Sequence, residues 1–464
     1  MAIEIGIFQN GASDLPTTRY DEMVVPTGSL AELAESYARV QVAQIRQGVL
    51  ADELGFDYYF MTEHHFQPEG AEFSPNPLMA EMAIAALTTR IRLAQATNVL
   101  TEHHPVRLAE QAAMLDIVSG GRMDFGVGRG YQPREVEILG GPLGASVQDT
   151  ERNRQFFEEA YEVLMKCWTQ ESWSHTGEFF SLPPRYTRWH HRQTMAYFNS
   201  RTDGPSVADV LNMSGVDQGS LVRSKGGMGI NDHDTTMREM QVFPRPIQKP
   251  YPQIWQPLTS PRSVEFAAKN GINGYFNASP TKRLRKDMDM YYEIAEKEGW
   301  PDRLDRGEFD FGWDSARRRG VITDRQIHIV DDGIGDLDRA ARGVEAQWDF
   351  YAAFGFIGAL NEPGEAPLPA DTKVTAELLR SKDVALHGTV DEITEKIIAL
   401  KNDAGYGKDF MINLHFEMAG FEGSEIEDQM RCFAERILPA LADECGGRAE
   451  KPESTVNLRP TPRA

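Results

Sequence analysis

The sequence predicts an α/β fold, a closed (β/α)8 TIM barrel with a long insertion between the fourth and fifth strand–helix units. Two observations support this prediction: about eight strand–helix units follow one another, and they resume after an irregular stretch at 183–252. Alternating strands and helices with short connections are typical of parallel strands covered by helices. The 464 residues are expected to form one barrel domain over 1–445 and a flexible tail at 446–464, since barrels with insertions exceed about 400 residues.

Composition and charge narrow the class of protein. Hydrophobic residues make up 41% and charged residues 25%, which is ordinary globular usage. The net charge of −22 disfavours nucleic acid or an anionic membrane as the main partner. No apolar run approaches the ~18–20 residues that span a bilayer, and the first residues lack the pattern of a signal peptide. The 3 cysteines, none in a CxxC spacing, are expected to be free thiols in a reducing cytoplasm.

The first half of the chain alternates short β-rich runs with amphipathic stretches. Strands are predicted at 3–8, 57–61, 91–96 and 123–127. Helices are predicted at 36–54, 77–87, 105–118 and 152–168. In a barrel, chemistry lies in the loops that follow the strands, so functional motifs are expected directly after these segments.

The pattern stops after Leu182 and resumes at 253. The stretch 183–252 is rich in Pro, Gly, Ser, Asp and Met, and so long an aperiodic segment usually forms a lid or a substrate-pocket segment. The later predicted strands are 253–255, 326–330 and 410–414, and the later helices are 261–270, 281–298, 334–354, 390–402 and 426–441.

Two histidine pairs follow predicted strands. His64 and His65 come after the second strand, and His103 and His104 come after the third. One reading is a flavin or substrate site. Adjacent residues in an extended chain point opposite ways, so the two histidines of one pair do not easily chelate one ion. A second reading is therefore a zinc site made of one histidine from each pair and a neighbouring glutamate, Glu63 or Glu102. The third is a set of solvated loop histidines.

A glycine-rich turn ends the fourth predicted strand. Gly128 and Gly130 flank Arg129, which would let a flat ring or an anion approach the backbone beside a charged side chain. The spacing is GxGxG and differs from the GxGxxG dinucleotide motif. The alternative is a tight turn with a surface arginine.

A second ligand-binding candidate opens the helix at 261–270. Ser260 is a good N-cap, Pro261 suits the first helical position, and Ser263 adds a hydroxyl one turn on. A helix N-terminus with free N–H groups is able to bind phosphate, although most such caps bind nothing. No Walker loop, HExxH motif or GxSxG elbow is present, which disfavours nucleotide hydrolysis and serine-hydrolase chemistry.

Together these motifs resemble the bacterial luciferase-like flavin-dependent monooxygenases. The resemblance is carried by TEHHF (62–66), SPNPL (74–78) and RIRLAQATNVLTEHHPVRLAEQAAMLDIVSGGRMDFGVGRGY (90–131) in that order. It covers 3–168, 251–276 and 387–442, and it leaves out 183–252 and 302–321.

The resemblance implies an FMNH2-dependent monooxygenase, a cytoplasmic flavoprotein oxidoreductase of the two-component type. Its cofactor would be reduced FMN, supplied by a separate NAD(P)H-dependent flavin reductase. O2 would then form a C4a-peroxyflavin that oxygenates a small organic substrate. The resemblance also implies a homodimer.

The resemblance assigns roles to particular residues. His64, His65 and His104 match the family's pocket histidines, with His64 as a base or hydrogen-bonding group. The flavin-binding positions correspond to Thr97, Asn98, Gly128, Arg129, Ser260 and Ser263. A non-proline cis peptide of some relatives would fall at Ala96–Thr97. True luciferases carry a reactive cysteine where this chain has Gly128, so light emission from a long-chain aldehyde is not expected.

Three rival hypotheses remain. The first is a deazaflavin-dependent hydride-transfer oxidoreductase on the same barrel, although the sequence shows no added basic track for the long acidic tail of that cofactor. The second is a non-catalytic flavin-binding subunit, against which the intact histidine pairs argue. The third is a metal-dependent barrel hydrolase, although the first strand is followed by Gln9-Asn10 and not by the HxH of such enzymes.

Overall fold

The computed structural model describes residues 2–21, 23–187, 200, 239–301, 307–331, 333–449, 454 and 456. Two compact units are present. The first, here called the barrel unit, comprises Met1–Val99, Leu115–Glu135 and Pro246–Ala464. The second unit comprises Leu100–Met114 and Val136–Arg245. No helix in the described part of the chain has the length and apolar character needed to cross a membrane.

Eight parallel strands close into a barrel, which confirms the predicted fold class. In chain order they are β1 (Ile3–Gln9), β4 (Tyr58–Met61), β5 (Arg92–Gln95), β7 (Met123–Gly128), β10 (Ile254–Pro257), β11 (Asn273–Phe276), β13 (Arg319–Ile329) and β15 (Phe410–His415). Pairing of β7 with β10 joins the two halves of the chain, and pairing of β1 with β15 joins its two ends. All eight strands belong to the barrel unit.

Shorter strands extend the barrel sheet. A two-residue strand β6 (Asn98–Val99) pairs with the end of β7. The second half of β13 pairs with β14 (Ala385–Gly388), and β12 (Trp313–Asp314) runs antiparallel to its start. Two hairpins lie outside this sheet: β2 (Thr17–Tyr20) with β3 (Met23–Pro26), and β8 (His175–Thr176) with β9 (Ser181–Leu182) in the second unit.

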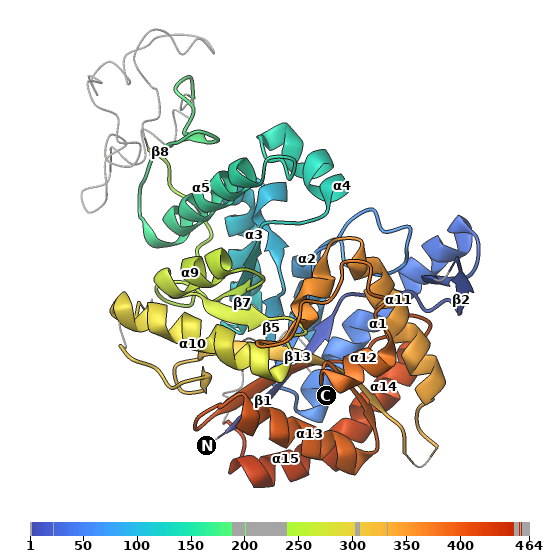
Figure 1. Cartoon of the computed structure of the whole chain (residues 1–464). Coiled ribbons are helices and arrows are strands. Elements are labelled where there is room, and N and C mark those ends of the chain that lie inside the picture. The colour runs from blue at the N-terminus through green and yellow to red at the C-terminus, as the bar shows by residue number, and fades with distance from the viewer. Residues whose placement is uncertain are drawn as a thin grey trace, which may run out of the picture. The chain divides into compact units, whose positions relative to one another are not determined.

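Helices cover the outside of the barrel (Figure 1). In the barrel unit they are α1 (Leu30–Leu54), α2 (Pro77–Leu87), α4 (Pro133–Glu135), α9 (Pro261–Lys269), α10 (Thr281–Lys297), α11 (Leu337–Ala352), α12 (Ala376–Ser381), α13 (Val390–Asp403), α14 (Gly423–Cys432) and α15 (Leu438–Cys445). Helix α3 (Pro105–Val118) begins in the second unit, and α5 (Thr150–Thr169) lies wholly within it.

The predicted boundaries hold where a local signal marks them. Helices α2 and α3 have the predicted bounds, since each begins at a proline. The prediction for α1 was too short, because α1 starts at Leu30 after the N-cap Ser29, whose side chain forms a capping box with Glu32. The first turns of α1 are exposed, so they carry no apolar pattern that would reveal them.

Two predictions for the second half of the chain need correction. Strand β13 was expected at 326–330 but begins at Arg319, and all its residues are buried. The single helix expected at 426–441 is divided into α14 and α15 by a π-helical turn at Phe433–Ile437. Pro439 follows this turn, and proline cannot donate the backbone hydrogen bond that a continuous helix needs.

The chain order places the long insertion where it was predicted, after β7 and α5 and before β10. Residues 188–199 and 201–238 of this insertion lie outside the described residues, so its role as a lid or substrate-pocket segment stays a prediction. The extent of the barrel domain and the flexibility of the tail stay predictions. Within the region assigned to the tail, Arg448 donates to Asp57 Oδ2 at 2.7 Å.

Aromatic side chains fill the barrel interior. The Phe60 ring lies 5.4 Å from Trp255 and 5.9 Å from Tyr275, and Phe8 lies 5.7 Å from Tyr275. These residues are buried, and they come from four different strands. The filled interior leaves room for a ligand only beyond the strand ends, which is where enzymes of this architecture build their sites.

Candidate active site

A cavity of about 580 Å³ lies at the carboxyl ends of the barrel strands, entirely within the barrel unit. Residues at or directly after the barrel strands line it, including Asn10, Thr62, Thr97, Arg129, Leu258, Asn277, Asp324 and His415. The volume falls within the range of small-molecule and cofactor sites. Its position is the one that the motif order predicted.

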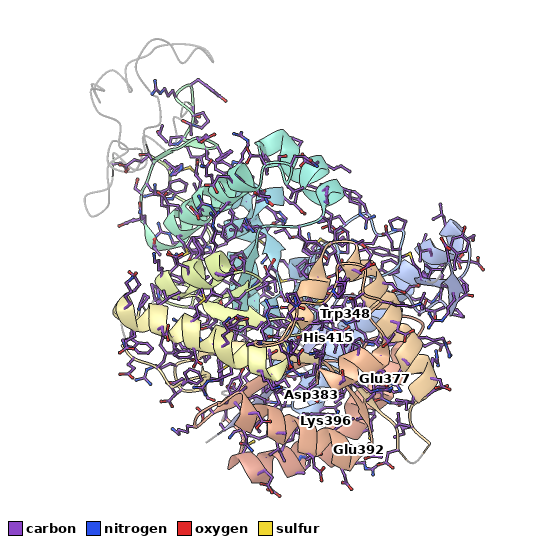
Figure 2. All side chains as sticks on the ribbon, viewed as in Figure 1. Trp348, Glu377, Asp383, Glu392, Lys396 and His415 are labelled. Carbon is purple, nitrogen blue, oxygen red and sulfur yellow. The ribbon has the colours of Figure 1, made fainter. Side chains whose placement is uncertain are left out.

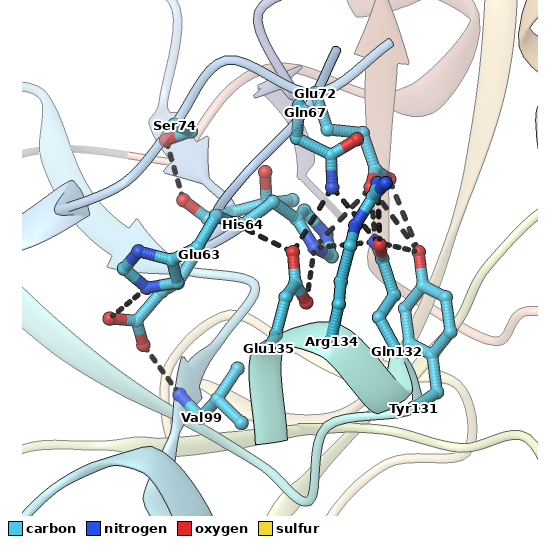
Figure 3. A network of polar contacts seen from close by, with 12 residues as sticks. Glu63, His64, Gln67, Glu72, Ser74, Val99, Tyr131, Gln132, Arg134 and Glu135 are labelled. Carbon is cyan, nitrogen blue, oxygen red and sulfur yellow. Dashed lines mark hydrogen bonds and ion pairs between the residues drawn. The ribbon is translucent and has the colours of Figure 1, made fainter. Parts of the chain in front are cut away.

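His64, one of the predicted residues that line this cavity, lies beside two buried glutamates (Figure 3). Its Nδ1 lies 3.3 Å from Glu72 Oε2 and 3.5 Å from Glu135 Oε2. Gln132 donates to Glu72 Oε2 at 2.9 Å, and Tyr131 donates to the same carboxylate. The backbone N–H of His64 donates to the carbonyl of Ser74 at 2.8 Å, which fixes the loop after β4.

Burial and neighbouring carboxylates set the proton affinity of this network. Burial would lower the pKa of His64, but Glu72, Glu135 and Glu63 outweigh it, so the pKa is raised. Burial raises the pKa of Glu72, and the neighbouring His64, which lowers this pKa, offsets only part of the increase. The cavity therefore holds a histidine that keeps its proton to higher pH than an ordinary histidine does.

His65 points away from this network. Its Nε2 lies 3.5 Å from Glu63 Oε1, its backbone N–H donates to Glu135 Oε1 at 2.7 Å, and its side chain does not line the cavity. Glu63 in turn accepts from the backbone N–H of Val99 at 2.7 Å. The histidine pair thus diverges as extended chain requires, and it is Glu63 that connects the loops after β4 and β5. A catalytic role of His65 stays a prediction.

The end of β5 carries the expected backbone feature. The Ala96–Thr97 peptide is cis, as the family resemblance predicted, and both residues line the cavity. Asn98 does not line the cavity. Its side chain instead donates to Gln95 Oε1 at 2.9 Å and to the Gly126 carbonyl at 3.0 Å.

Gly128 faces Thr97 across the two strands. A Cβ at this position would clash with Thr97 Oγ1, so glycine is required by the close approach of β7 to the segment after β5. Gly130, with φ +68°, and Arg129 continue the cavity wall. The turn after β7 therefore borders the cavity, as predicted. The binding roles of Gly128 and Arg129 stay predictions.

The hydroxyls at the start of α9 form a capping box. Ser260 Oγ accepts from the Ser263 backbone N–H at 3.3 Å, and Ser263 Oγ donates to the Ser260 carbonyl at 2.7 Å. Ser263 and Thr259 line the cavity, whereas Ser260 lines a smaller adjoining groove. The helix N-terminus therefore meets the cavity at Ser263, and phosphate binding by this pair stays a prediction.

His104 belongs to the second unit, so its relation to the cavity stays a prediction. Its ring meets Phe180 edge-on at 5.7 Å, and burial lowers its pKa.

Five buried side-chain atoms of residues in the cavity lining have no hydrogen-bond partner among the described residues. Gln256 Oε1, Asn277 Oδ1 and Ser279 Oγ lie in or after β10 and β11, and the other two are Asn10 Oδ1 and His415 Nδ1. A buried polar atom without a partner costs about 1–3 kcal/mol, so such atoms normally meet a ligand or water. This side of the cavity is therefore built for a polar ligand.

Sequence reasoning missed several cavity residues. Glu72 lies in the loop after β4 and Glu135 ends the short helix α4, and since neither stands in a motif, only the folded chain brings them to His64. His415 had a usable signal, since it directly follows the predicted strand 410–414, and applying the strand-end rule to every polar residue would have found it. Asp324 had no such signal, because it precedes the predicted strand 326–330 and is placed only by the earlier start of β13 at Arg319.

Comparison with known proteins gives a family match. Residues 27–198 match the model of the luciferase-like monooxygenase family. A curated relative, the oxygenase component of the flavin-dependent trigonelline monooxygenase of Acinetobacter baylyi, is 26% identical over 48% of this chain and 45% of its own length. The chain spans about half the length of the curated relatives it matches, from 38% to 58% among the first of them.

Solved structures share the fold over nearly the whole chain. Monooxygenase RslO1 from Streptomyces bottropensis has a TM-score of 0.62 and 22% identity, covering 95% of this chain and 100% of its own. The oxygenating constituent of 3,6-diketocamphane monooxygenase from Pseudomonas putida, in complex with FMN, has a TM-score of 0.60 and 18% identity, covering 95% and 98%.

Proposed function

The chain belongs to the luciferase-like monooxygenase family, and we propose that it is the oxygenase of a two-component flavin-dependent monooxygenase. Reduced FMN comes from an NAD(P)H-dependent flavin reductase, and one atom of O2 is transferred to a small organic substrate. The observation that carries the proposal is the position of His64, inside the cavity at the strand ends and between two buried glutamates. The relatives support it, because one is named as a flavin-dependent oxygenase component.

The cavity suits reduced FMN. The flat, amphipathic ring would lie against Thr97 and the apolar side chain of Leu258, and the phosphate would lie toward Arg129 and Ser263 at the start of α9. The unpartnered polar atoms in the lining would bond the heteroatoms at the ring edge. When bound, reduced FMN supplies the electrons that activate O2.

His64 controls protons at this site in the proposal. Its Nδ1 lies 3.3 Å from Glu72 Oε2, and its raised pKa lets the ring keep its proton to higher pH than an ordinary histidine does. A protonated group in a cavity that excludes water can hold or deliver one proton while bulk solvent stays away from the reacting atoms. Glu72 and Glu135 position the ring.

Removal of this group should separate cofactor binding from oxygen transfer. His64→Ala is expected to bind reduced FMN within about threefold of the unaltered protein. After mixing with O2 it is expected to release H2O2 about tenfold faster, because the proton-holding group is lost and water enters its space. Stopped-flow mixing of the preformed complex with O2 measures this rate in the absence of substrate.

The control for that experiment is His328→Asn, a buried histidine outside the cavity lining. It is expected to leave the rate unchanged. Equal H2O2 release from His64→Ala and the unaltered protein would exclude the role of His64. Anaerobic hydride transfer with a deazaflavin cofactor, without binding of reduced FMN, would replace the proposed function by the hydride-transfer alternative.

A further inference from the structure

A second histidine–carboxylate pair lines the same cavity and has no part in the proton control assigned to His64. Asp324 lies in β13 and His415 ends β15, the strand paired with it. His415 Nε2 lies 2.7 Å from Asp324 Oδ2 (Figure 2 labels His415). Tyr275 donates to the same carboxylate oxygen at 3.1 Å, and the backbone N–H of Ala278 donates to the other. Asp324 is therefore a fixed acceptor.

The state of Asp324 decides the tautomer of His415. Burial would raise the pKa of Asp324, but His415, the Ala278 N–H and Arg325 lower it below its ordinary value. An ionised carboxylate only accepts hydrogen bonds, so His415 Nε2 carries the proton and Nδ1 is a bare acceptor in the neutral ring. This is the arrangement in which a carboxylate prepares a histidine to accept a proton at its other nitrogen.

That acceptor has no partner. His415 is 6% exposed, and its Nδ1 makes no hydrogen bond within the described part of the chain. The ring cannot turn freely, because it stacks on Phe8 with 4.0 Å between ring centroids and 12° between planes. A fixed, buried acceptor in a cavity wall is satisfied when a ligand brings a donor to it.

Aromatic side chains in the cavity lining indicate what kind of molecule carries the donor that reaches His415 Nδ1. Tyr131 meets Phe354 at 5.2 Å and Phe356 at 5.0 Å, both edge-on, and Trp348 adds a further ring to the lining. Aromatic walls favour flat aromatic ligands through stacked and edge-to-face contacts. The donor that reaches His415 is therefore best carried on an aromatic ring.

We propose that the substrate is a hydroxyl-bearing aromatic compound, a phenol or a hydroxylated heteroaromatic ring, and that His415 Nδ1 accepts its hydroxyl proton. This inference rests on the proposed function and names the substrate class of that site. The substrate O–H bond breaks, the Nδ1–H bond forms, and the electron pair stays on the substrate oxygen. No electrons are exchanged, and Asp324 stabilises the resulting imidazolium. The phenolate is the more electron-rich ring and reacts more readily with an electrophilic oxygen.

Other ionisable groups around the pair affect its pH dependence. Arg325 follows Asp324 in β13, Tyr275 faces it from β11, and Glu417 lies just beyond β15. Burial raises the pKa of Glu417 to about 7, although the backbone N–H groups of Asn10 and Gly11 oppose the shift. Glu417 therefore contributes to any pH dependence of this part of the cavity near neutral pH, and variants must be compared at a single pH.

The test uses 4-nitrophenol as a probe with the full-length protein, without flavin. The phenolate of this probe absorbs in the visible range, so its ionisation on binding is read directly. The unaltered protein is expected to bind the probe as the phenolate at a pH where the free probe is mostly protonated. His415→Asn retains a donor to Asp324 but is not a base, and is expected to lower the bound phenolate-to-phenol ratio about tenfold or more, equivalent to one pKa unit.

His328→Asn is the matched control and is expected to leave the ratio unchanged, with thermal melting showing that both variants fold. An unchanged ratio in His415→Asn, no binding of 4-nitrophenol by the unaltered protein, or equally tight binding of 4-nitroanisole, which lacks the hydroxyl, would overturn the inference. Failure to bind reduced FMN in a separate titration would overturn the proposed function and leave the probe result standing.

Discussion

At the scale of single residues, the chemistry of the cavity depends on carboxylates that act through a histidine. Glu72 is the first of the groups that raise the pKa of His64 against the effect of burial. Glu72→Gln keeps the shape of the side chain and removes its charge. It is expected to lower the pKa of His64, because burial then prevails. Imidazole resonances followed by NMR across pH 5–9 would measure this, with the range chosen around the ordinary histidine pKa of ~6.5.

Glu69→Gln is the matched control for that titration. Glu69 is a solvent-exposed partner of Arg134 and does not line the cavity, so the pKa of His64 should stay where it is. The same pKa in Glu72→Gln and in the unaltered protein would show that Glu135 and Glu63 suffice to set it.

The sequence allowed His64 to be predicted but not its partners. His64 directly follows a strand and lies in a recognisable motif, whereas Glu72 and Glu135 approach it only through the folding of the chain. The metal-site alternative for the histidine pairs has no support within the described residues, where no group of three ligating side chains is arranged to hold an ion.

At the scale of elements, the start of α9 combines a structural role with a proposed binding role. Ser260→Ala removes an N-cap and is expected to lower the free energy of unfolding by about 1 kcal/mol. If the capping box also supports the FMN phosphate, the same change should weaken reduced-FMN binding by about tenfold, since a lost hydrogen bond to a charged group costs about 1.5 kcal/mol. Chemical denaturation and an FMN titration measure the two effects.

Thr389→Ala provides the comparison, because Thr389 forms the same capping box at α13 and does not line the cavity. It should lose similar stability and bind reduced FMN normally. Weakened FMN binding in both variants would assign the effect to general destabilisation.

The paired strands β13 and β14 carry an acid-sensitive element. His328 and His387 face each other in register, and both nitrogens of His387 lack a partner among the described residues. Burial, with His328 and nearby basic side chains, lowers the pKa of His387 to about 3. Between that value and the unfolded-state pKa the unfolded chain binds more protons, so stability is greatest above pH ~6.5 and falls as the pH decreases toward 3.

His387→Asn should reduce this acid sensitivity. Between pH 7 and pH 5 the unaltered protein is expected to lose about 2 kcal/mol more unfolding free energy than the variant, from the lowered pKa of His387 alone. Urea denaturation at the two pH values gives the difference. Parallel losses in both proteins would show that His387 does not govern the acid response.

Element boundaries could be predicted where sequence chemistry marks them. Prolines at the starts of α2 and α3 fixed those helices, while the exposed first turns of α1 had no apolar pattern. The short strands β11 and β14 were missed, because four residues that include glycine show neither alternation nor a β-branched run. Pairing within the closed barrel, and not local propensity, makes them strands.

At the scale of the whole molecule, barrel closure is what assembles the site. Strands β7 and β10 are separated in the chain by the long insertion, yet their pairing places the Gly128–Tyr131 turn and the start of α9 around one cavity. The order of strand–helix units was enough to predict this closure. The side-chain network inside the cavity was not predictable, because it joins loops that are distant in the sequence.

The central claim is that this cavity binds reduced FMN, and an anaerobic equilibrium titration with reduced FMN tests it most directly. The unaltered protein is expected to bind one reduced FMN per chain saturably, and Arg129→Ala, which removes the charge at the cavity wall, is expected to bind at least about tenfold more weakly. Absence of saturable binding, or equal affinity in the Arg129→Ala protein, would contradict the account.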